Sequence, residues 1–197
     1  MFETCARCGR HSDHAIMEGA EVICPECGNR TVLQRLPLFF LSGASGAGKS
    51  TAARILLDTR REFITMECDI LWHERFNTPE NNYADFRDAW LRLAANHAQH
   101  GQVSLLCGCI TPEQIDARPR KAYFSETHYC AIVLSEEEFR RRGEKRGFLP
   151  EHMESSLQFS RWLIENGEKH GMRIIDATDM TPSETAEAVA EFVLARL

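Results

Sequence analysis

The chain lacks the features that would place it in a membrane or on the secretory pathway. Its longest apolar run, Leu36 to Leu41, is far shorter than the ~20 residues that a membrane-spanning helix needs. The first residues, Met1 to Cys5, have neither the basic region nor the apolar stretch of a secretory signal. Internal repeats and low-complexity segments are also absent from the sequence. We therefore expect a cytoplasmic protein.

The chain also has no excess of positive charge. Its 23 Lys and Arg residues face 29 Asp and Glu residues, which gives a net charge of −6. Proteins that hold long nucleic acids through the phosphates usually carry a positive excess, so this balance disfavours a nucleic-acid partner, although it is compatible with a local basic patch. The 197 residues, 43% of them apolar, suit one globular domain with a small appendage.

Eight cysteines without an export signal indicate free thiols and metal ligands rather than disulfides. Four of them form two C-x-x-C pairs separated by 15 residues: Cys5, Cys8, Cys24 and Cys27. Two pairs at this spacing predict a structural zinc site with four thiolate ligands in a tetrahedron. The alternatives, two disulfides or a redox-active C-x-x-C, need a context that this chain lacks.

The cysteine pairs define a predicted zinc ribbon over residues 1–35. About 30 residues cannot build an adequate core alone, so we expect the metal to supply the folding free energy. His11 and His14 lie between the pairs, and we expect them to be exposed because four cysteines already fill the coordination shell. Ribbons dock on nucleic acid, on protein or on a neighbouring domain, and the sequence leaves the partner open.

The most informative motif is residues 43–50, Gly-Ala-Ser-Gly-Ala-Gly-Lys-Ser, which match the phosphate-binding pattern G-x-x-x-x-G-K-[ST]. An apolar run precedes the motif and a helix-compatible stretch follows it, as a strand–loop–helix phosphate site requires. Lys49 is expected to reach the β- and γ-phosphates of ATP, and Ser50 to ligate Mg²⁺. The residues predicted to contact the nucleotide here are Gly43, Ser45, Gly46, Ala47, Gly48, Lys49, Ser50 and Thr51. A ligand-free glycine turn is the alternative, and it leaves the lysine and the hydroxyl unexplained.

Strand-like runs alternate with helical ones from residue 36 to 197, the predicted second domain. The expected strands are 38–41, 62–67, 103–107, 130–134 and 172–175, each short and apolar as in strands buried on both faces. Capping boxes mark helix starts at Thr111–Gln114, Ser135–Glu138 and Thr181–Glu184, and residues 83–100 form an amphipathic helix. The sequence therefore predicts an α/β fold, a three-layer sandwich around a parallel sheet.

A carboxylate at the end of the second strand is the candidate for chemistry at an acceptor. Asp69 follows this strand, where side chains point into the ligand crevice of a parallel sheet. It is expected to accept the proton of an acceptor hydroxyl or to hold Mg²⁺ through water, and Glu67 and Glu74 are weaker candidates. The third strand ends without an acid, which disfavours a mechanical ATPase. Cys107 and Cys109 at this strand end are expected to be buried thiols.

A run of positive charge follows the fourth strand. Arg142 and Arg146 lie four residues apart on one helix face, in a predicted lid around residues 140–150, where they would clamp the transferring phosphoryl group. The alternative is a solvated helix face. Arg120 belongs to a second, weaker basic site that either binds an anionic acceptor or lies in a surface loop.

These residues carry a family resemblance over residues 37–197. The phosphate loop, Asp69, the arginine run and the segment 174–178 resemble the small P-loop kinases, which include nucleoside monophosphate, shikimate and gluconate kinases. Residues 146–159 are similar to gluconate kinase, and 158–166 resemble bacterial AAA-type nucleotide-kinase-like ATPases. The resemblance implies the strand order 2-3-1-4-5, with Asp176 and Thr178 lining the adenine. The acceptor motifs of these kinases are absent, and the ribbon precedes the domain instead of lying in a lid.

The expected function is an ATP-dependent phosphotransferase that uses Mg²⁺ and carries a structural Zn²⁺. Lys49, Asp69, Arg142 and Arg146 are its predicted catalytic residues, and Asp69 and Arg120 its predicted acceptor-binding residues. A nucleoside-like, nucleotide-like or sugar-acid-like small molecule is the expected acceptor. Two alternatives remain open at this point: a kinase or ATPase that acts on nucleic acid docked by the ribbon, and a nucleotide sensor without enzymatic activity.

Overall fold

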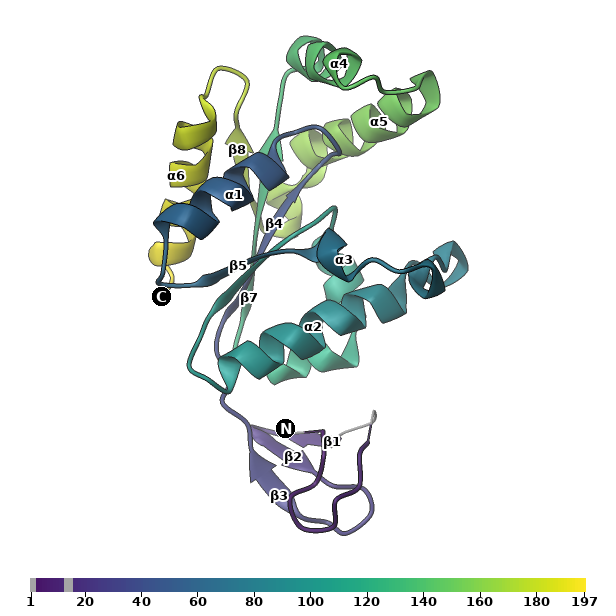
Figure 1. Ribbon diagram of the computed structural model, residues 1–197, viewed down its shortest axis with the longest axis vertical. Coiled ribbons are helices and arrows are strands. Elements are labelled where there is room, and N and C mark those ends of the chain that lie inside the picture. The colour runs from purple at the N-terminus through teal and green to yellow at the C-terminus, as the bar shows by residue number, and fades with distance from the viewer. Residues whose placement is uncertain (1–2, 13–15) are drawn as a thin grey trace.

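The computed structural model describes residues 3–12 and 16–197, so His14, one of the two histidines between the cysteine pairs, lies outside the described residues. Figure 1 shows an α/β body with a small β-sheet unit at one end. Within the described residues, no helix combines the length and the apolar character needed to cross a membrane.

The body is built on a five-stranded parallel sheet. Its strands are β4 (Leu38–Gly43), β5 (Ile64–Glu67), β6 (Ser104–Cys107), β7 (Thr127–Val133) and β8 (Met172–Asp176). Their order across the sheet is β5-β6-β4-β7-β8, which confirms the predicted order 2-3-1-4-5. Strand β7 begins three residues earlier than predicted, and β5 begins two residues later.

Helices cover both faces of this sheet (Figure 1). They are α1 (Lys49–Thr59), α2 (Ala84–Ala98), α3 (Pro112–Asp116), α4 (Glu136–Lys145), α5 (Pro150–Asn166) and α6 (Pro182–Leu194). Alternate side chains of β4 enter two separate cores: Phe39 and Leu41 pack with residues of α1 and α6, and Leu38 and Phe40 pack with residues of α2. This arrangement explains why β4 is apolar throughout, because a strand covered on both faces has no solvent side.

Three short 3₁₀ helices connect β5 to α2, at Cys68–Leu71, Glu74–Phe76 and Pro79–Asn81. Two more are at Pro119–Tyr123 and Glu168–His170. The amphipathic helix predicted at 83–100 is α2, which begins after Tyr83 because that residue has a positive φ of 54°. His97 on this helix is only partly buried, and its Nδ1 lies 3.0 Å from Ser104 Oγ.

Two of the predicted capping boxes form. At α6, Thr181 Oγ1 accepts from the Glu184 N–H at 3.2 Å, and Glu184 accepts from the Thr181 N–H at 2.8 Å. The box predicted at Ser135 is only half made: Ser135 Oγ accepts from the Glu138 N–H at 3.3 Å, but the Glu138 carboxylate binds arginines of α4 instead of returning to Ser135. Arg141 and Arg142 add a positive charge to their N–H donors, which the neutral N–H of Ser135 does not, so the carboxylate binds the arginines.

The small unit contains an antiparallel sheet of β1 (Ile16–Glu18), β2 (Glu21–Ile23) and β3 (Arg30–Val32). It lies at the amino end of β4, whereas the phosphate loop follows the carboxyl end of the same strand (Figure 1). Val22 and Leu33 are buried in the same apolar cluster as residues of α2. The unit is therefore packed against the body rather than joined to it by the chain alone.

Candidate functional site

The phosphate-binding motif forms the turn between β4 and α1, as its sequence predicted. Gly43 has a φ of 148°, and a Cβ there would lie 2.8 Å from the carbonyl oxygen of Ile132, so no larger residue fits. Gly48, with a φ of 118°, is the N-cap of α1, so the positive end of the helix dipole points into the loop. Lys49 Nζ donates to the carbonyl oxygens of Gly43 at 2.7 Å and of Ala44 at 3.1 Å. The Lys49 side chain therefore folds over the loop and binds its backbone carbonyls.

A pocket of about 100 Å³ opens beside this loop. It is lined by residues from four segments: Ser45, Gly46, Gly48, Lys49, Ser50 and Thr51 of the loop and α1, Glu67 and Asp69 after β5, Cys107, Gly108 and Cys109 after β6, and Arg146 after α4. The structure therefore brings Lys49, Ser50, Asp69 and Arg146 together, although the sequence separates them by up to 97 positions. Gly43 and Ala47 belong to the loop without lining the pocket.

Two carboxylates also line this pocket. Glu67 is the last residue of β5, beside Cys107 of β6, and Asp69 lies in the 3₁₀ turn that follows. Among the residues that line this pocket, they are the only acids, and β6 contributes none. Glu67 is partly buried and Asp69 is exposed. Glu74, the third acid considered from the sequence, is not among the lining residues.

Two arginines of the segment predicted to form a lid lie at the phosphate loop. Arg142 Nε donates to Glu138 Oε1 at 2.6 Å, and its Nη1 donates to the carbonyl oxygen of Ala47 at 3.3 Å. Hydrogen bonds from Arg141 and from Arg142 lower the pKa of Glu138 from an ordinary value of 4.5 to about 2. Arg146, one turn further along, lines the pocket itself. The two arginines predicted to act together therefore lie at the same loop, one over its backbone and one facing its pocket.

The residues predicted to line an adenine lie at the end of β8. Thr178 Oγ1 donates to Asp176 Oδ1 at 2.5 Å, and the Ser135 N–H donates to Thr178 Oγ1 at 2.8 Å. These bonds tie the loop after β8 to the start of α4. Asp176 and Thr178 line a second, more open hollow of about 420 Å³ and do not line the phosphate-loop pocket.

Arg120, predicted to contact an acceptor, has other partners. Its Nη1 lies 2.9 Å from Asp88 Oδ2, and its Nε lies 3.3 Å from Glu3 Oε1. Its side chain is only 13% exposed, and it does not line the phosphate-loop pocket. The acceptor contact of Arg120 stays a prediction, and the structure gives the residue a contact with the cysteine-rich unit that sequence spacing did not reveal.

The two thiols after β6 differ from each other. Cys107 is buried, as predicted, and burial raises the pKa of its thiol well above the usual value. Cys109 was expected to be buried and is exposed: its Sγ lies 3.5 Å from Lys49 Nζ and 3.2 Å from the carbonyl oxygen of Gly43. The prediction was wrong because Cys109 lies two residues beyond the strand, where the chain passes over the pocket.

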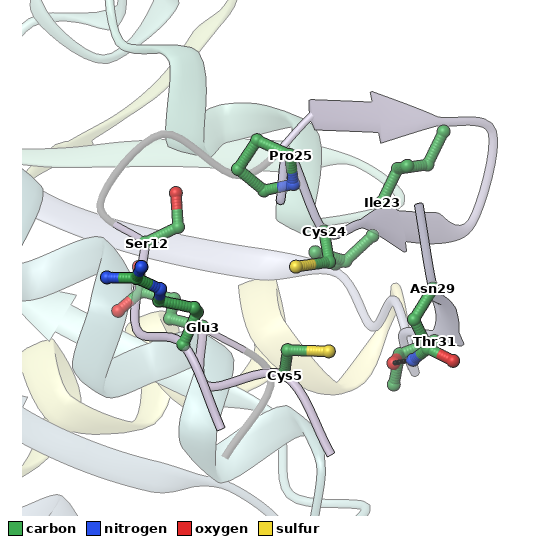
Figure 2. Close-up of a pocket in the computed structure, with 10 residues that line it drawn as sticks. Glu3, Cys5, Ser12, Ile23, Cys24, Pro25, Asn29 and Thr31 are labelled. Atoms are coloured by element: carbon green, nitrogen blue, oxygen red, sulfur yellow. Dashed lines mark hydrogen bonds between the residues drawn. The ribbon is translucent and has the colours of Figure 1, made fainter. Parts of the chain in front are cut away.

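The four paired cysteines gather in the small unit. Their sulfur atoms all lie within 4.8 Å of one another, with Cys5 and Cys27 at 3.6 Å and Cys8 and Cys24 at 3.7 Å. A tetrahedron with Zn–S arms of about 2.3 Å has edges of roughly 3.8 Å, so these separations fit a four-thiolate metal site. They are far longer than the ~2.05 Å of a disulfide. Figure 2 shows Cys5 and Cys24 at a hollow of about 20 Å³, little more than the space of one water.

No protein-family model and no curated protein matches the sequence. The structure is similar to a tunicamycin resistance protein of Deinococcus radiodurans, with a TM-score of 0.60 and 16% identity over 81% of this chain and 96% of that one. A gluconokinase of Sinorhizobium meliloti 1021 gives 0.55 and 18%, over 82% and 95%. A shikimate kinase of Acinetobacter baumannii, solved with shikimate, gives 0.54 and 12%, also over 82% and 95%. The chain therefore has the α/β fold of the small P-loop kinases.

Proposed function

We propose that the chain is an ATP-dependent phosphotransferase that moves the γ-phosphoryl group of Mg·ATP to a small-molecule acceptor. The observation that carries the proposal is the pocket in which Lys49, Asp69 and Arg146 meet around the phosphate loop. Phosphoryl transfer needs a group that orients the acceptor and cations that stabilise the transferring phosphoryl group, and this pocket holds a candidate for each. The names of the gluconokinase and the shikimate kinase support transfer to a small acceptor.

In this proposal the loop holds the phosphates. Its backbone N–H groups and the N-terminus of α1 bind phosphoryl oxygens, and Lys49 leaves the carbonyls of Gly43 and Ala44 to neutralise the β- and γ-phosphates. Ser50 is the residue that would hold Mg²⁺, and Glu67, which lines the same pocket, would bind waters of that ion. A bound Mg²⁺ supplies charge neutralisation of the phosphates.

Asp69 orients the acceptor hydroxyl and accepts its proton as the oxygen attacks phosphorus. The new oxygen–phosphorus bond forms while the bond between the γ-phosphorus and the bridging oxygen of ADP breaks. Arg142 and Arg146 bind the equatorial oxygens of the transferring group, and closure of the lid around 140–150 keeps water out. Exclusion of water matters because water would otherwise replace the acceptor.

Two further sites complete the proposal. The loop at Asp176 and Thr178 binds the adenine, since it lies next to the start of α4 in an open hollow that the base can enter. The cysteine-rich unit holds one Zn²⁺ through Cys5, Cys8, Cys24 and Cys27, whose spacing fits a closed tetrahedron. That metal is structural, because the unit lies at the opposite end of the strands from the phosphate loop (Figure 1). The cytoplasmic location stays a prediction from the sequence.

An ADP-release assay with Mg·ATP tests the proposal against nucleosides, nucleoside monophosphates, sugar acids and RNA ends. We expect acceptor-dependent ADP formation that Lys49→Ala abolishes while the variant keeps its fold. Background ADP with every acceptor, together with tight ATP binding, would favour a sensor. Salt-sensitive binding of short RNA or DNA would favour the nucleic-acid alternative.

A further inference from the structure

One face of helix α2 packs against the wall of the phosphate-loop pocket. Trp90 on this helix is 3% exposed, and its ring lies against Gly108, which lines that pocket. A Cβ on Gly108 would lie 3.0 Å from Trp90 Cη2 and 3.6 Å from the Cβ of Cys68, so no larger residue fits there without a shift. Cys68 shares an apolar cluster with Trp90 and stands between Glu67 and Asp69, the two acids of the pocket. Trp90 therefore backs both wall segments.

The wall segment under Trp90 is bonded to the phosphate loop. The Gly108 N–H donates to the carbonyl oxygen of Leu41 on β4 at 3.1 Å, and Cys109 Sγ lies 3.2 Å from the carbonyl oxygen of Gly43. Within the described part of the chain, the indole N–H of Trp90 has no hydrogen-bond partner, so packing holds the ring in place. Because close-packed interiors transmit displacements, a shift of Trp90 would move the pocket wall.

The opposite face of α2 carries the cysteine-rich unit. Asp88, Arg92 and Gln99 are four and seven residues apart, a spacing that places them on one face of the helix. Trp90 lies a little more than half a turn from Asp88 and from Arg92, since a turn holds about 3.6 residues. His97 lies on the Trp90 face and contacts Ser104 at the start of β6. The helix thus braces β6 on one side and meets the unit on the other.

The contact between the unit and α2 is charged and shielded from water. Glu3, which is 5% exposed, pairs with Arg92 and with Arg120, and Arg120 pairs in turn with Asp88. Glu3 lies two residues before Cys5, and its carbonyl oxygen accepts from the Ser12 N–H at 2.9 Å. The carboxylate that binds α2 is therefore placed by the fold of the first cysteine pair.

We propose that the cysteine-rich unit positions the phosphate-loop pocket through α2: the docked unit holds the helix from one face, so that Trp90 on the other face keeps Gly108 in place. The chain then binds a nucleotide more weakly when the unit is undone. Trp90 is a positioning residue, because it touches the wall without lining the pocket. This role requires that the loop bind a nucleotide, as in the proposed function, but not that it transfer a phosphoryl group.

Calorimetry with a non-hydrolysable ATP analogue and Mg²⁺ tests the coupling without turnover. We expect Glu3→Ala to weaken binding of the analogue about fivefold or more, the range of ordinary coupling between sites. Cys24→Ser, which removes a thiolate from the cluster, should weaken it in the same way. Glu26→Ala, at an exposed position of the same unit, should bind the analogue like the wild type.

Variants of Trp90 test the route. Trp90→Leu should weaken binding of the analogue about tenfold, and Trp90→Phe should restore part of the loss because it keeps an aromatic ring against Gly108. Adding Glu3→Ala to Trp90→Leu should cost little more, since the contact that transmits the effect is already gone. Two independent effects would instead multiply, so the double variant separates coupling from a general loss of stability.

Hydrogen exchange of the full chain follows the same route without nucleotide. Peptides that cover residues 104–111 should exchange faster in Glu3→Ala and in Cys24→Ser than in the wild type. Peptides that cover residues 172–176 on β8, at the far edge of the sheet, should keep the wild-type rate. Each variant is measured below the onset of its thermal unfolding, so that the comparison concerns folded protein.

Three results would overturn this role of the unit: wild-type affinity for the analogue in Glu3→Ala or in Cys24→Ser, multiplied effects in the double variant, or exchange that rises equally in both sets of peptides. The proposed function fails by a different result, namely background ADP release with every acceptor while ATP still binds. A chain that loses nucleotide affinity in Glu3→Ala without ever transferring phosphate would keep the coupling and lose the kinase assignment.

Discussion

Glu3 of the cysteine-rich unit lies 2.6 Å from Arg92 on helix α2, through its Oε2 and the arginine Nη2. Glu3 is 5% exposed, and its other carboxylate oxygen lies 3.3 Å from Arg120 Nε. A second link is neutral: the Gln34 N–H donates to Gln99 Oε1 at 3.1 Å, and Gln99 returns a bond to the Gln34 carbonyl at 3.1 Å. The unit therefore has specific partners at α2, namely Arg92 within the helix and Gln99 at its C-cap.

Replacing Glu3 tests how strongly this contact holds the unit. We expect Glu3→Ala to lower the free energy of unfolding by about 2 kcal/mol, because it leaves the shielded guanidinium of Arg120 with one carboxylate instead of two. Arg92 contributes less because it is 40% exposed and solvent screens its pair. Urea denaturation measures the change. Glu26→Ala, at an exposed position of the same unit, is the matched control, and an equal loss in both variants would contradict the role of Glu3.

Metal removal tests the cysteine cluster. We expect one zinc per chain by elemental analysis, lost in Cys24→Ser and retained in Cys109→Ser, whose sulfur belongs to the phosphate-loop pocket. Without metal the four thiols cannot hold the unit together, so Val22 and Leu33 lose their cover and the midpoint of thermal unfolding falls. Purified protein without zinc and with the same melting curve before and after chelation would exclude a metal site.

Substitutions at the phosphate loop test the chemistry. Lys49→Ala should lower turnover by about 10³-fold or more, because the charge that neutralises the transferring group is lost. Asp69→Asn should lower kcat more than it raises KM, since an amide still orients the acceptor but cannot take its proton. Asp58→Asn, an exposed change on α1, is the control for both. Full activity in Asp69→Asn would remove this aspartate from the mechanism.

Acid titration tests the ion pairs that Glu138 forms with two arginines of α4. The pKa of Glu138 is lowered to about 2 in the folded protein, so its bonds to Arg141 and Arg142 stabilise the fold above the unfolded-state pKa near 4.5. That contribution is lost as the pH falls from about 4.5 through 2, because protonation ends the ion pairs. We expect Glu138→Gln to flatten the acid limb of a plot of urea midpoint against pH. Glu137→Gln, at an exposed neighbour, should keep the wild-type slope; identical slopes in all three proteins would count against the pairs.

Alkylation of Cys109 tests how near the exposed thiol is to the nucleotide. Because its Sγ lies 3.5 Å from Lys49 Nζ, a carboxamidomethyl group there would occupy the phosphate pocket. We expect iodoacetamide to abolish ATP binding and Mg·ATP to slow the modification of Cys109. In Cys109→Ser, ATP binding should be unchanged by the reagent. Peptide mass spectrometry identifies the modified residue. Fast labelling of Cys109 with no effect on ATP binding would show that the thiol points away from the nucleotide.

The strands and the phosphate loop were predictable because their signals are local, whereas the order of the strands came from the resemblance to the small P-loop kinases. A strand buried on both faces must be apolar along its length, and β4 is; a loop that wraps phosphate needs glycines and a lysine at fixed spacing, and residues 43–50 have them. Asp69 was predicted to lie in this crevice because the end of a parallel strand has a known direction, and it lines the pocket. The clustering of the four cysteines followed from their own spacing.

Other features depended on contacts between distant segments. Arg120 and Arg87 look alike in the sequence, yet one pairs with Glu3 and Asp88 and the other is buried without a counter-ion. Cys109 was expected to be buried and is exposed. The sequence did not reveal this exposure, because it depends on where the chain turns after β6. The sequence by itself determined the elements and the phosphate-loop turn, since periodicity and motif spacing act over a few residues. The tertiary structure alone decided which charges are paired and which face a pocket, because the burial and neighbours of a charged side chain are set by segments far away in the chain.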